Sequence, residues 1–110
     1  MLGVFAKSVL DKRQLKFSKI FEYKEARYKA MMIMMFVAMN PSEYELDHLR
    51  NHRPDIDGID GLDRELKLEY YNAMLYASDR VLDGLEAFLR DKTEANWRAV
   101  THAMRKDLYL

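Results

Sequence analysis

AMMIMMFVAM, residues 30–39, is the longest apolar run in the sequence. A helix that is apolar on every side is surrounded by protein, so we expect this run to form the centre of the core. Methionine side chains also suit an adaptable binding groove, which is the less favoured alternative. The run is too short to cross a membrane, because a spanning helix needs about 20 apolar residues.

Toward the N-terminus, apolar residues continue at alternating spacings of four and three, which is the heptad pattern of a helix that pairs with another. No residue between 7 and 39 is a helix breaker, so we expect one helix over about 7–39. Its stripe is Leu10, Gln14, Phe17, Phe21, Lys24, Tyr28, Met31, Met35 and Ala38, and the polar residues Gln14 and Lys24 interrupt it.

This first helix is long for a domain of 110 residues. Roughly 33 residues at 1.5 Å each reach about 50 Å, whereas a compact domain of this length has a radius of gyration of about 13 Å. Soluble monomers rarely leave a large apolar patch uncovered. We therefore predict a homo-oligomer, with a dimer favoured. The interface candidates are Leu10, Phe17, Phe21, Tyr28, Met31 and Met35.

Three further helices are predicted after Pro41, which biases the preceding residue out of the helical region. Ser42 and Glu45 form a capping box for the first of them, and Thr93 is the N-cap of the last. The predicted ranges are about 43–51, 62–90 and 94–108, with a loop rich in Asp and Gly over 53–61. The fold class is therefore all-α, an up-and-down bundle of two long and two shorter helices in a single domain, 1–110.

Gly84 lies on the apolar side of the predicted helix over 62–90, near Ala77 and Phe88 at helical spacing. A glycine inside a helix costs about 1 kcal/mol relative to alanine. We therefore predict that a neighbouring helix approaches Gly84 closely.

Acidic and basic residues balance over the whole chain, 18 against 18, but not along it. Residues 1–40 carry a net charge of +5, residues 41–69 carry −5, and residues 70–110 are neutral. The simplest interpretation is that the basic segment lies along the acidic one, within a chain or between chains. The chain has no cysteine, which excludes disulfides and thiolate chemistry and fits a cytoplasmic protein.

The best metal-like cluster is Glu45, His48 and His52, which share one face of a helix. Glu-x-x-His is half of a di-metal carboxylate motif, but that site needs a second Glu-x-x-His and two further glutamates. The sequence has no second copy. We therefore expect surface histidines, predict no cofactor, and keep metal or ligand binding by this face as the alternative.

The aspartates of residues 55–65 invite comparison with a calcium-binding loop. An EF-hand counted from Asp55 needs Asp or Asn at position 59, Gly at 60 and a carboxylate at 66. The chain has Ile59, Asp60 and Leu66 instead. We predict a capped acidic turn rather than a calcium site.

The first helix is basic and aromatic, which raises nucleic-acid or anionic-lipid binding as a further alternative. The neutral total charge instead favours the polar side of a coiled coil, so nucleic acid is not the leading partner. The sequence contains no catalytic triad order, nucleophile elbow, phosphate loop or paired-carboxylate motif. We therefore predict no catalytic residue and a protein that is not an enzyme.

The last part of the chain carries LYASDRVL at residues 75–82, FLR at 88–90 and AMRKDL at 103–108. This pattern resembles one in uncharacterised bacterial helical-domain proteins, where it closes a helical domain that often follows an N-terminal membrane span. The resemblance implies an all-helical fold and a bacterial source, and it is tied to no known activity. It also implies a relative that lacks the span, or the cytosolic part of a membrane-tethered protein.

The leading functional prediction is a non-enzymatic interaction or assembly module that forms a homo-oligomeric helical bundle. The alternatives are a metal- or ligand-binding bundle and a nucleic-acid or lipid binder, and no feature of the sequence names a protein partner.

Overall fold

The computed structural model describes the backbone of residues 2–109 and the side chains of residues 15–109. Within that range the chain forms five α-helices and no strand, so the predicted all-α class is confirmed. The helices are α1 (Leu2–Met39), α2 (Glu43–His52), α3 (Gly58–Ala73), α4 (Asp79–Arg90) and α5 (Glu94–Tyr109). Among the residues described, no helix combines the length and the apolar content that a membrane crossing requires.

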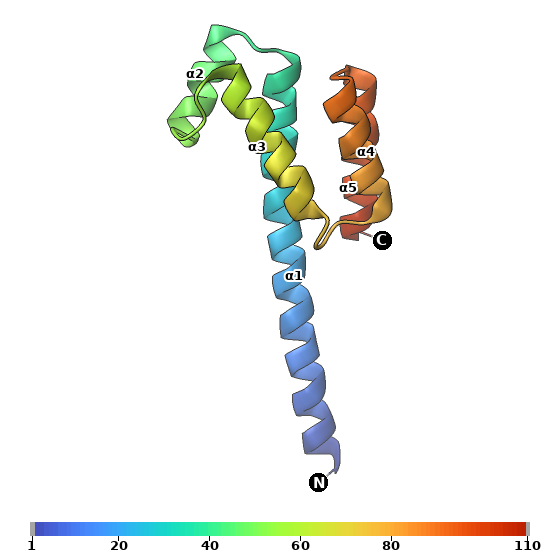
Figure 1. Ribbon diagram of the computed structural model, residues 1–110. Helices are drawn as coiled ribbons and strands as arrows, with labels where there is room; N and C mark the ends of the chain where they lie inside the picture. Colours follow the sequence, from blue (N-terminus) through green and yellow to red (C-terminus); the bar gives the residue numbers. More distant parts are fainter. Residues whose placement is uncertain (1, 110) are drawn as a thin grey trace.

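Four of the helices, α1, α3, α4 and α5, form an up-and-down bundle in which successive helices run in opposite directions (Figure 1). α1 packs against α3 and α5, and α4 closes the bundle by packing against the same two helices. The short α2 lies at the end of the bundle where α1 finishes. At the other end α1 continues beyond its neighbours, so the molecule is elongated, with extents of 63 × 27 × 19 Å.

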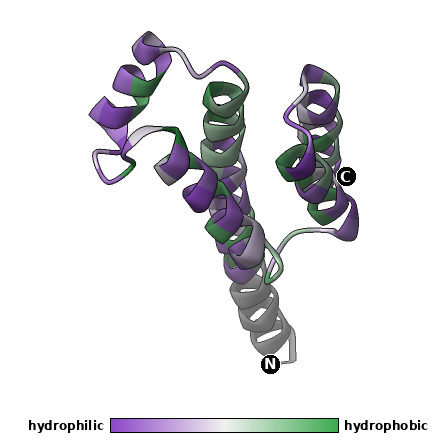
Figure 2. Ribbon diagram, turned by 45° about the horizontal axis from the view of Figure 1, so that its top comes forward, coloured by the Kyte–Doolittle hydropathy of each residue, from purple (hydrophilic) through white to green (hydrophobic). Residues whose placement is uncertain are grey.

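The core is built around the apolar run of α1, as predicted, and apolar residues line this part of α1 between the other helices (Figure 2). Burial of one large apolar side chain contributes about 1.5–3 kcal/mol. The buried residues of α1 are Tyr28, Met31, Met34, Met35, Val37 and Ala38, and they meet Leu62, Leu66, Val81, Leu85, Phe88, Val100 and Met104 from the other helices.

One expectation about this run was wrong. Protein does not surround it on every side, because Ile33 and Phe36 are exposed. The physical reason is that a helix in a four-helix bundle turns only one side toward the core. The outer side of α1 therefore remains a surface, although its residues are apolar.

The continuous helix predicted over 62–90 was also wrong, because the chain reverses direction between Ala73 and Asp79 (Figure 1). The end of α3 tightens, with the Tyr76 amide donating to the Ala73 carbonyl at 3.1 Å. Ser78 then begins α4 as an N-cap, its Oγ accepting the Val81 amide at 3.3 Å. This reversal folds α4 back along α3, which lets one apolar face cover another.

The predicted N-caps of the two short helices are confirmed. Ser42 Oγ accepts the Glu45 amide at 3.2 Å, and Thr93 Oγ1 accepts the Asn96 amide at 3.2 Å. α3 begins earlier than predicted, at Gly58, whose φ of 70° lies in the left-handed region that favours glycine.

The predicted close approach at Gly84 is confirmed as well. A Cβ added there would lie 3.0 Å from Cβ and 3.1 Å from Cα of Val100 on α5. Gly84 therefore sets how closely α4 and α5 pack.

Candidate functional site

A buried ion pair fastens α1 to α3. Glu69 is only 5% exposed, and Arg27 Nε donates to its Oε2 at 3.2 Å, while the Arg27 Nη2 pairs with the other carboxylate oxygen. A buried carboxylate needs such a partner, because an unpaired charge inside a protein is costly. This pair joins the basic segment to the acidic one within a single chain.

A second polar contact fastens α1 to α5 through Asp107. Its carboxylate accepts a hydrogen bond from the Tyr28 hydroxyl at 2.5 Å and pairs with Lys24 Nζ at 2.8 Å. Burial alone would raise the pKa of Asp107, but the hydrogen bonds from Lys24 and Tyr28 outweigh it and hold the pKa below its ordinary value. Burial, and then the bond to Asp107, raise the pKa of Tyr28.

The cover over α1 ends at Phe21. Its ring packs edge to face on Tyr109, the last residue of α5, with ring centroids 5.8 Å apart. Residues 2–20 of α1, which we call the arm, continue past this point (Figure 1). The described part of the arm exposes three large apolar side chains, Leu15, Phe17 and Ile20, and Phe17 is 74% exposed.

The predicted interface stripe therefore divides into two parts. Tyr28, Met31 and Met35 are buried in the core of their own chain, so their assignment to an interface between chains is corrected. These residues keep the heptad spacing because α3 and α5 of the same chain supply their cover. Phe17 is free to contact a partner, Phe21 is partly buried, and the side chain of Leu10 lies outside the described residues.

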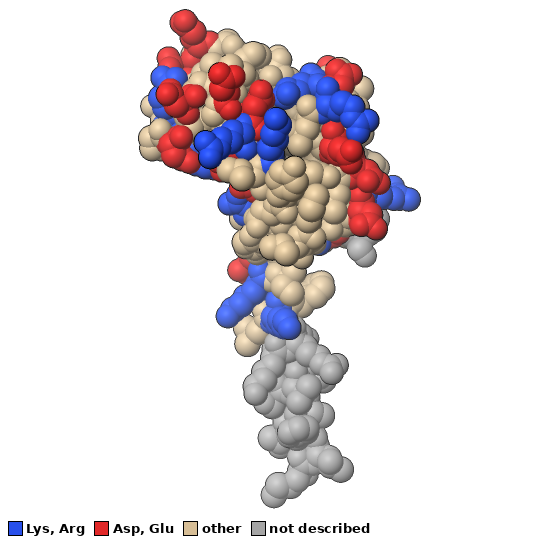
Figure 3. All heavy atoms as spheres, viewed as in Figure 1, with Lys and Arg blue, Asp and Glu red and all other residues tan. Residues whose placement is uncertain are grey.

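A second apolar surface closes the end of the bundle from which the arm emerges. It consists of Tyr71, Met74, Leu75 and Tyr109, and we call it the floor. Leu75 is 86% exposed, the highest value among the large apolar side chains described. Figure 3 shows uncharged atoms gathered over the lower part of α3 and the turn that follows it.

Sequence reasoning missed the floor because it placed residues 71–75 inside the continuous helix predicted over 62–90. The reversal after Ala73 instead places Met74 and Leu75 in an exposed turn, next to Tyr71 at the exposed end of α3. The signal that could have found it is Ser78 followed by Asp79, which is typical of a helix N-terminus.

The arm differs from the rest of the chain in charge. Residues 2–20 hold five Lys or Arg and one Asp, a net charge of +4, so residues 21–110 carry −4. Lys16 and Lys19 are exposed on the described part of the arm. The arm is therefore a basic helix with apolar residues, attached to an acidic bundle.

The three metal candidates lie on one wall of a pocket between α1 and α2. The pocket has a volume of about 330 Å³, and its other wall is apolar, with Ile33 and Val37 of α1. The rings of His48 and His52 meet edge to face with centroids 5.3 Å apart. Across residues 15–109, no three His, Asp or Glu side chains converge on a point where they could hold a metal ion. The arrangement suits an apolar molecule better than a metal.

The aspartates of residues 55–65, whose spacing resembles that of a calcium-binding loop, are spread over a turn and a helix. Asp55 accepts two hydrogen bonds from the Arg53 guanidinium, at 3.0 and 2.9 Å, and Arg53 also reaches Glu65 at 2.8 Å. Asp60 lies in the first turn of α3. The carboxylate of Asp55 is thus paired with the Arg53 guanidinium of the same chain.

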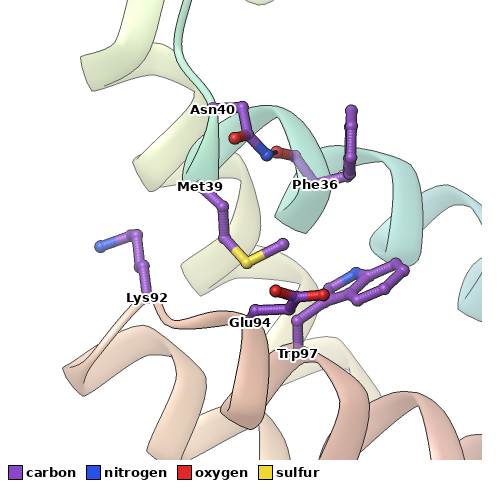
Figure 4. Close-up of a pocket in the computed structure, with 6 residues that line it drawn as sticks. All are labelled: Phe36, Met39, Asn40, Lys92, Glu94 and Trp97. Carbon is purple, nitrogen blue, oxygen red and sulfur yellow. Dashed lines mark hydrogen bonds between the residues drawn. The ribbon is translucent and has the colours of Figure 1, made fainter.

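A second pocket, of about 390 Å³, lies between the end of α1 and the start of α5 (Figure 4). The side chain of Met39 points from α1 toward Trp97, whose indole nitrogen donates to the Met32 carbonyl at 3.3 Å. The charged residues of its rim are engaged elsewhere, Lys92 with Asp63 at 3.6 Å and Glu94 with Arg98 at 2.9 Å. Both charged side chains that line this recess are therefore already paired within the chain.

No known protein family, curated protein or solved structure matches this chain. The resemblance of the C-terminal pattern to bacterial helical-domain proteins stays a prediction. The function is therefore argued from the surfaces described above.

Proposed function

We propose that this protein is a non-enzymatic assembly module whose arm binds a second copy of the same chain. The observation that supports the proposal is the exposure of Leu15, Phe17 and Ile20 beyond the point where α5 ends. Within one chain nothing described covers these side chains, and exposed apolar patches of monomers are usually small or functional. A second copy of the chain can cover these side chains with its own arm and bundle. Dimers with two-fold symmetry are the commonest homo-oligomers.

The proposal also accounts for the heptad spacing of α1. The stripe keeps its spacing from the buried part of α1 into the arm, where Phe17 is its exposed member, although the polar residues Gln14 and Lys24 interrupt it. In the buried part, that spacing meets helices of the same chain, since Tyr28 and Met31 are covered by them. In the arm, the same spacing favours packing against a helix of another chain, because no helix of the same chain lies beside the described part of the arm.

The experiment compares two substitutions at equally exposed aromatic residues. Phe17, on the arm, and Tyr44, on α2, are 74% and 75% exposed, so replacing either by aspartate removes little packing within one chain. Phe17→Asp should lower the molar mass measured by light scattering from a dimer toward a monomer, and Tyr44→Asp should leave it unchanged. A dimer that survives Phe17→Asp would refute the assignment to the arm, and a wild-type monomer that binds anionic vesicles or heparin would favour the basic-helix alternative.

A second candidate function is supported by the pocket beside His48 and His52. We propose that it binds a small, largely apolar molecule whose polar group faces the histidines. Ligand pockets of proteins are mostly apolar with a few placed polar groups, and this pocket combines the apolar wall of α1 with Glu45, His48 and His52 on α2.

Fluorescence of the apolar dye 8-anilinonaphthalene-1-sulfonate tests this second candidate. Ile33→Asp places a charge on the apolar wall, whereas Met39→Asp places one in the other recess. The dye signal should fall with Ile33→Asp and persist with Met39→Asp. Equal signals from both variants would contradict a site between α1 and α2.

A further inference from the structure

The arm and the floor meet at one end of the bundle. The turn after α3 lies against α1 at the base of the arm, where the Tyr23 and Tyr76 rings pack with centroids 5.2 Å apart. Asn72 Nδ2 also donates to the Tyr23 hydroxyl at 3.2 Å. On the α5 side, Tyr109 of the floor touches Phe21 at the base of the arm. Tyr109 of the floor therefore lies directly beside the base of the arm.

The length of the arm limits how two chains can pair through the arm and the floor. Nineteen residues of helix are about 28 Å long at 1.5 Å per residue, which is the span between the floor and the N-terminal end of α1. If two chains lie antiparallel with their arms side by side, the end of each arm arrives at the base of the other. That base is where the floor lies.

Charge distinguishes this arrangement from parallel pairing of the two chains. Each arm carries +4 and each bundle −4, so a parallel pair would bring arm beside arm and bundle beside bundle, whereas the antiparallel pair brings each arm to the acidic bundle of the other copy. Like charges in contact are destabilising. The bundle carries the opposite charge, and the exposed Asp79 and Asp83 lie on α4, which begins just after the floor. Figure 3 shows acidic residues along α4 beside the uncharged floor.

We infer that, in the dimer proposed above, the N-terminal half of each arm, residues 2–10, binds the floor of the other copy. Leu75 and Tyr71 give the docked helix an apolar contact surface, and Asp79 and Asp83 offer opposite charge to Lys7, the one basic residue of the docked segment. The exchange is reciprocal, so each chain both gives an arm and receives one. This inference rests on the proposed function, because it assigns the partner surface of the same arm.

Disulfide trapping tests the inference directly, because the natural chain has no cysteine. Chains with Leu75→Cys alone are mixed with chains of a different tag length that carry Ser8→Cys alone, and the mixture is oxidised. A disulfide between the two kinds of chain should form. The control pairs Ser8→Cys with Tyr44→Cys, since Tyr44 is also highly exposed but lies on α2, at the far end of the bundle.

The possible outcomes separate this inference from the proposed function. A disulfide between positions 8 and 75, and none between 8 and 44, supports the exchange. A dimer by light scattering that gives only 8–8 disulfides, or 8–44 disulfides at equal yield, refutes the arm–floor contact and leaves the dimer standing. A monomer at all concentrations refutes both.

A substitution on the floor gives a second, independent readout. Leu75→Lys removes an apolar contact and adds a charge of the same sign as the arm, so the dimer dissociation constant should rise roughly tenfold or more. The midpoint of urea unfolding of the dissociated chain should not change, because Leu75 is exposed. Leu75→Met keeps the apolar contact and should bind like the natural chain. Equal dissociation constants for the Lys and Met variants would overturn the assignment of the floor.

Discussion

Gly84 of α4 lies against Val100 of α5 so closely that a Cβ on Gly84 would come within 3.0 Å of the Val100 Cβ and 3.1 Å of its Cα. Part of this contact is backbone, which cannot move aside as a side-chain tip can. Gly84→Leu should therefore destabilise the fold by overpacking, by about 1–3 kcal/mol. The control is Glu86→Leu, at an exposed position of α4 two residues further on, which should change stability little. Urea unfolding followed by circular dichroism measures both, and equal midpoints would mean that the two helices can separate without cost.

The Arg27–Glu69 pair predicts an asymmetry between single and double substitutions. Arg27→Met leaves the buried carboxylate of Glu69 without its cation and should cost about 3 kcal/mol. Replacing both residues by methionine removes the buried charge as well, so the double variant should recover most of that loss. A double variant as unstable as Arg27→Met would show that the cost comes from packing and not from the stranded charge.

The low pKa of Asp107 predicts how stability depends on acid. The folded chain holds this carboxylate charged at pH values where the unfolded chain already binds a proton. The stabilisation is therefore fully present above the ordinary aspartate pKa of about 3.9 and is lost as the pH falls through the lower, folded value. Asp107→Asn should be less stable than the natural chain at pH 7, and the difference should shrink below about pH 4. Urea midpoints at a series of pH values check this, and a pH-independent difference would contradict it.

The cap at Ser78 predicts a cost for losing the hydroxyl. Ser78→Ala removes the acceptor of the Val81 amide and should lower stability by about 1 kcal/mol. Ser18→Ala, at an exposed position inside α1, is the matched control and should be neutral or slightly stabilising. If both variants unfolded at the same urea concentration, the reversal between α3 and α4 would owe its stability to packing alone.

Local patterns in the sequence predicted the parts of this fold that depend on local chemistry. The apolar run of α1, the caps at Ser42 and Thr93 and the close contact at Gly84 each have a signal within a few residues. The reversal after Ala73 has no Gly or Pro, so its only local mark is the cap at Ser78. The reversal is favoured because it lets α4 pack against α3 and α5. These contacts join residues far apart in the sequence, so a short stretch of sequence does not reveal them.

The candidate site could be predicted only in part for the same reason. Heptad spacing predicted both Phe17 and Tyr28 as interface residues, although Tyr28 is covered by its own chain. The boundary between them is set by where α5 ends, at Tyr109, and this depends on how the helices are stacked. The floor was missed because it exists only once the chain has reversed.

Sedimentation equilibrium of the natural chain at tens of micromolar is the measurement that tests the central claim most directly. The proposed exchange of arms predicts a single species of twice the 13.1 kDa mass of one chain, which dissociates when Phe17 is replaced by aspartate. It also predicts weaker association at high salt, because the arm and the bundle carry opposite charges that salt screens. A chain that sediments at 13.1 kDa over the whole concentration range would contradict the account.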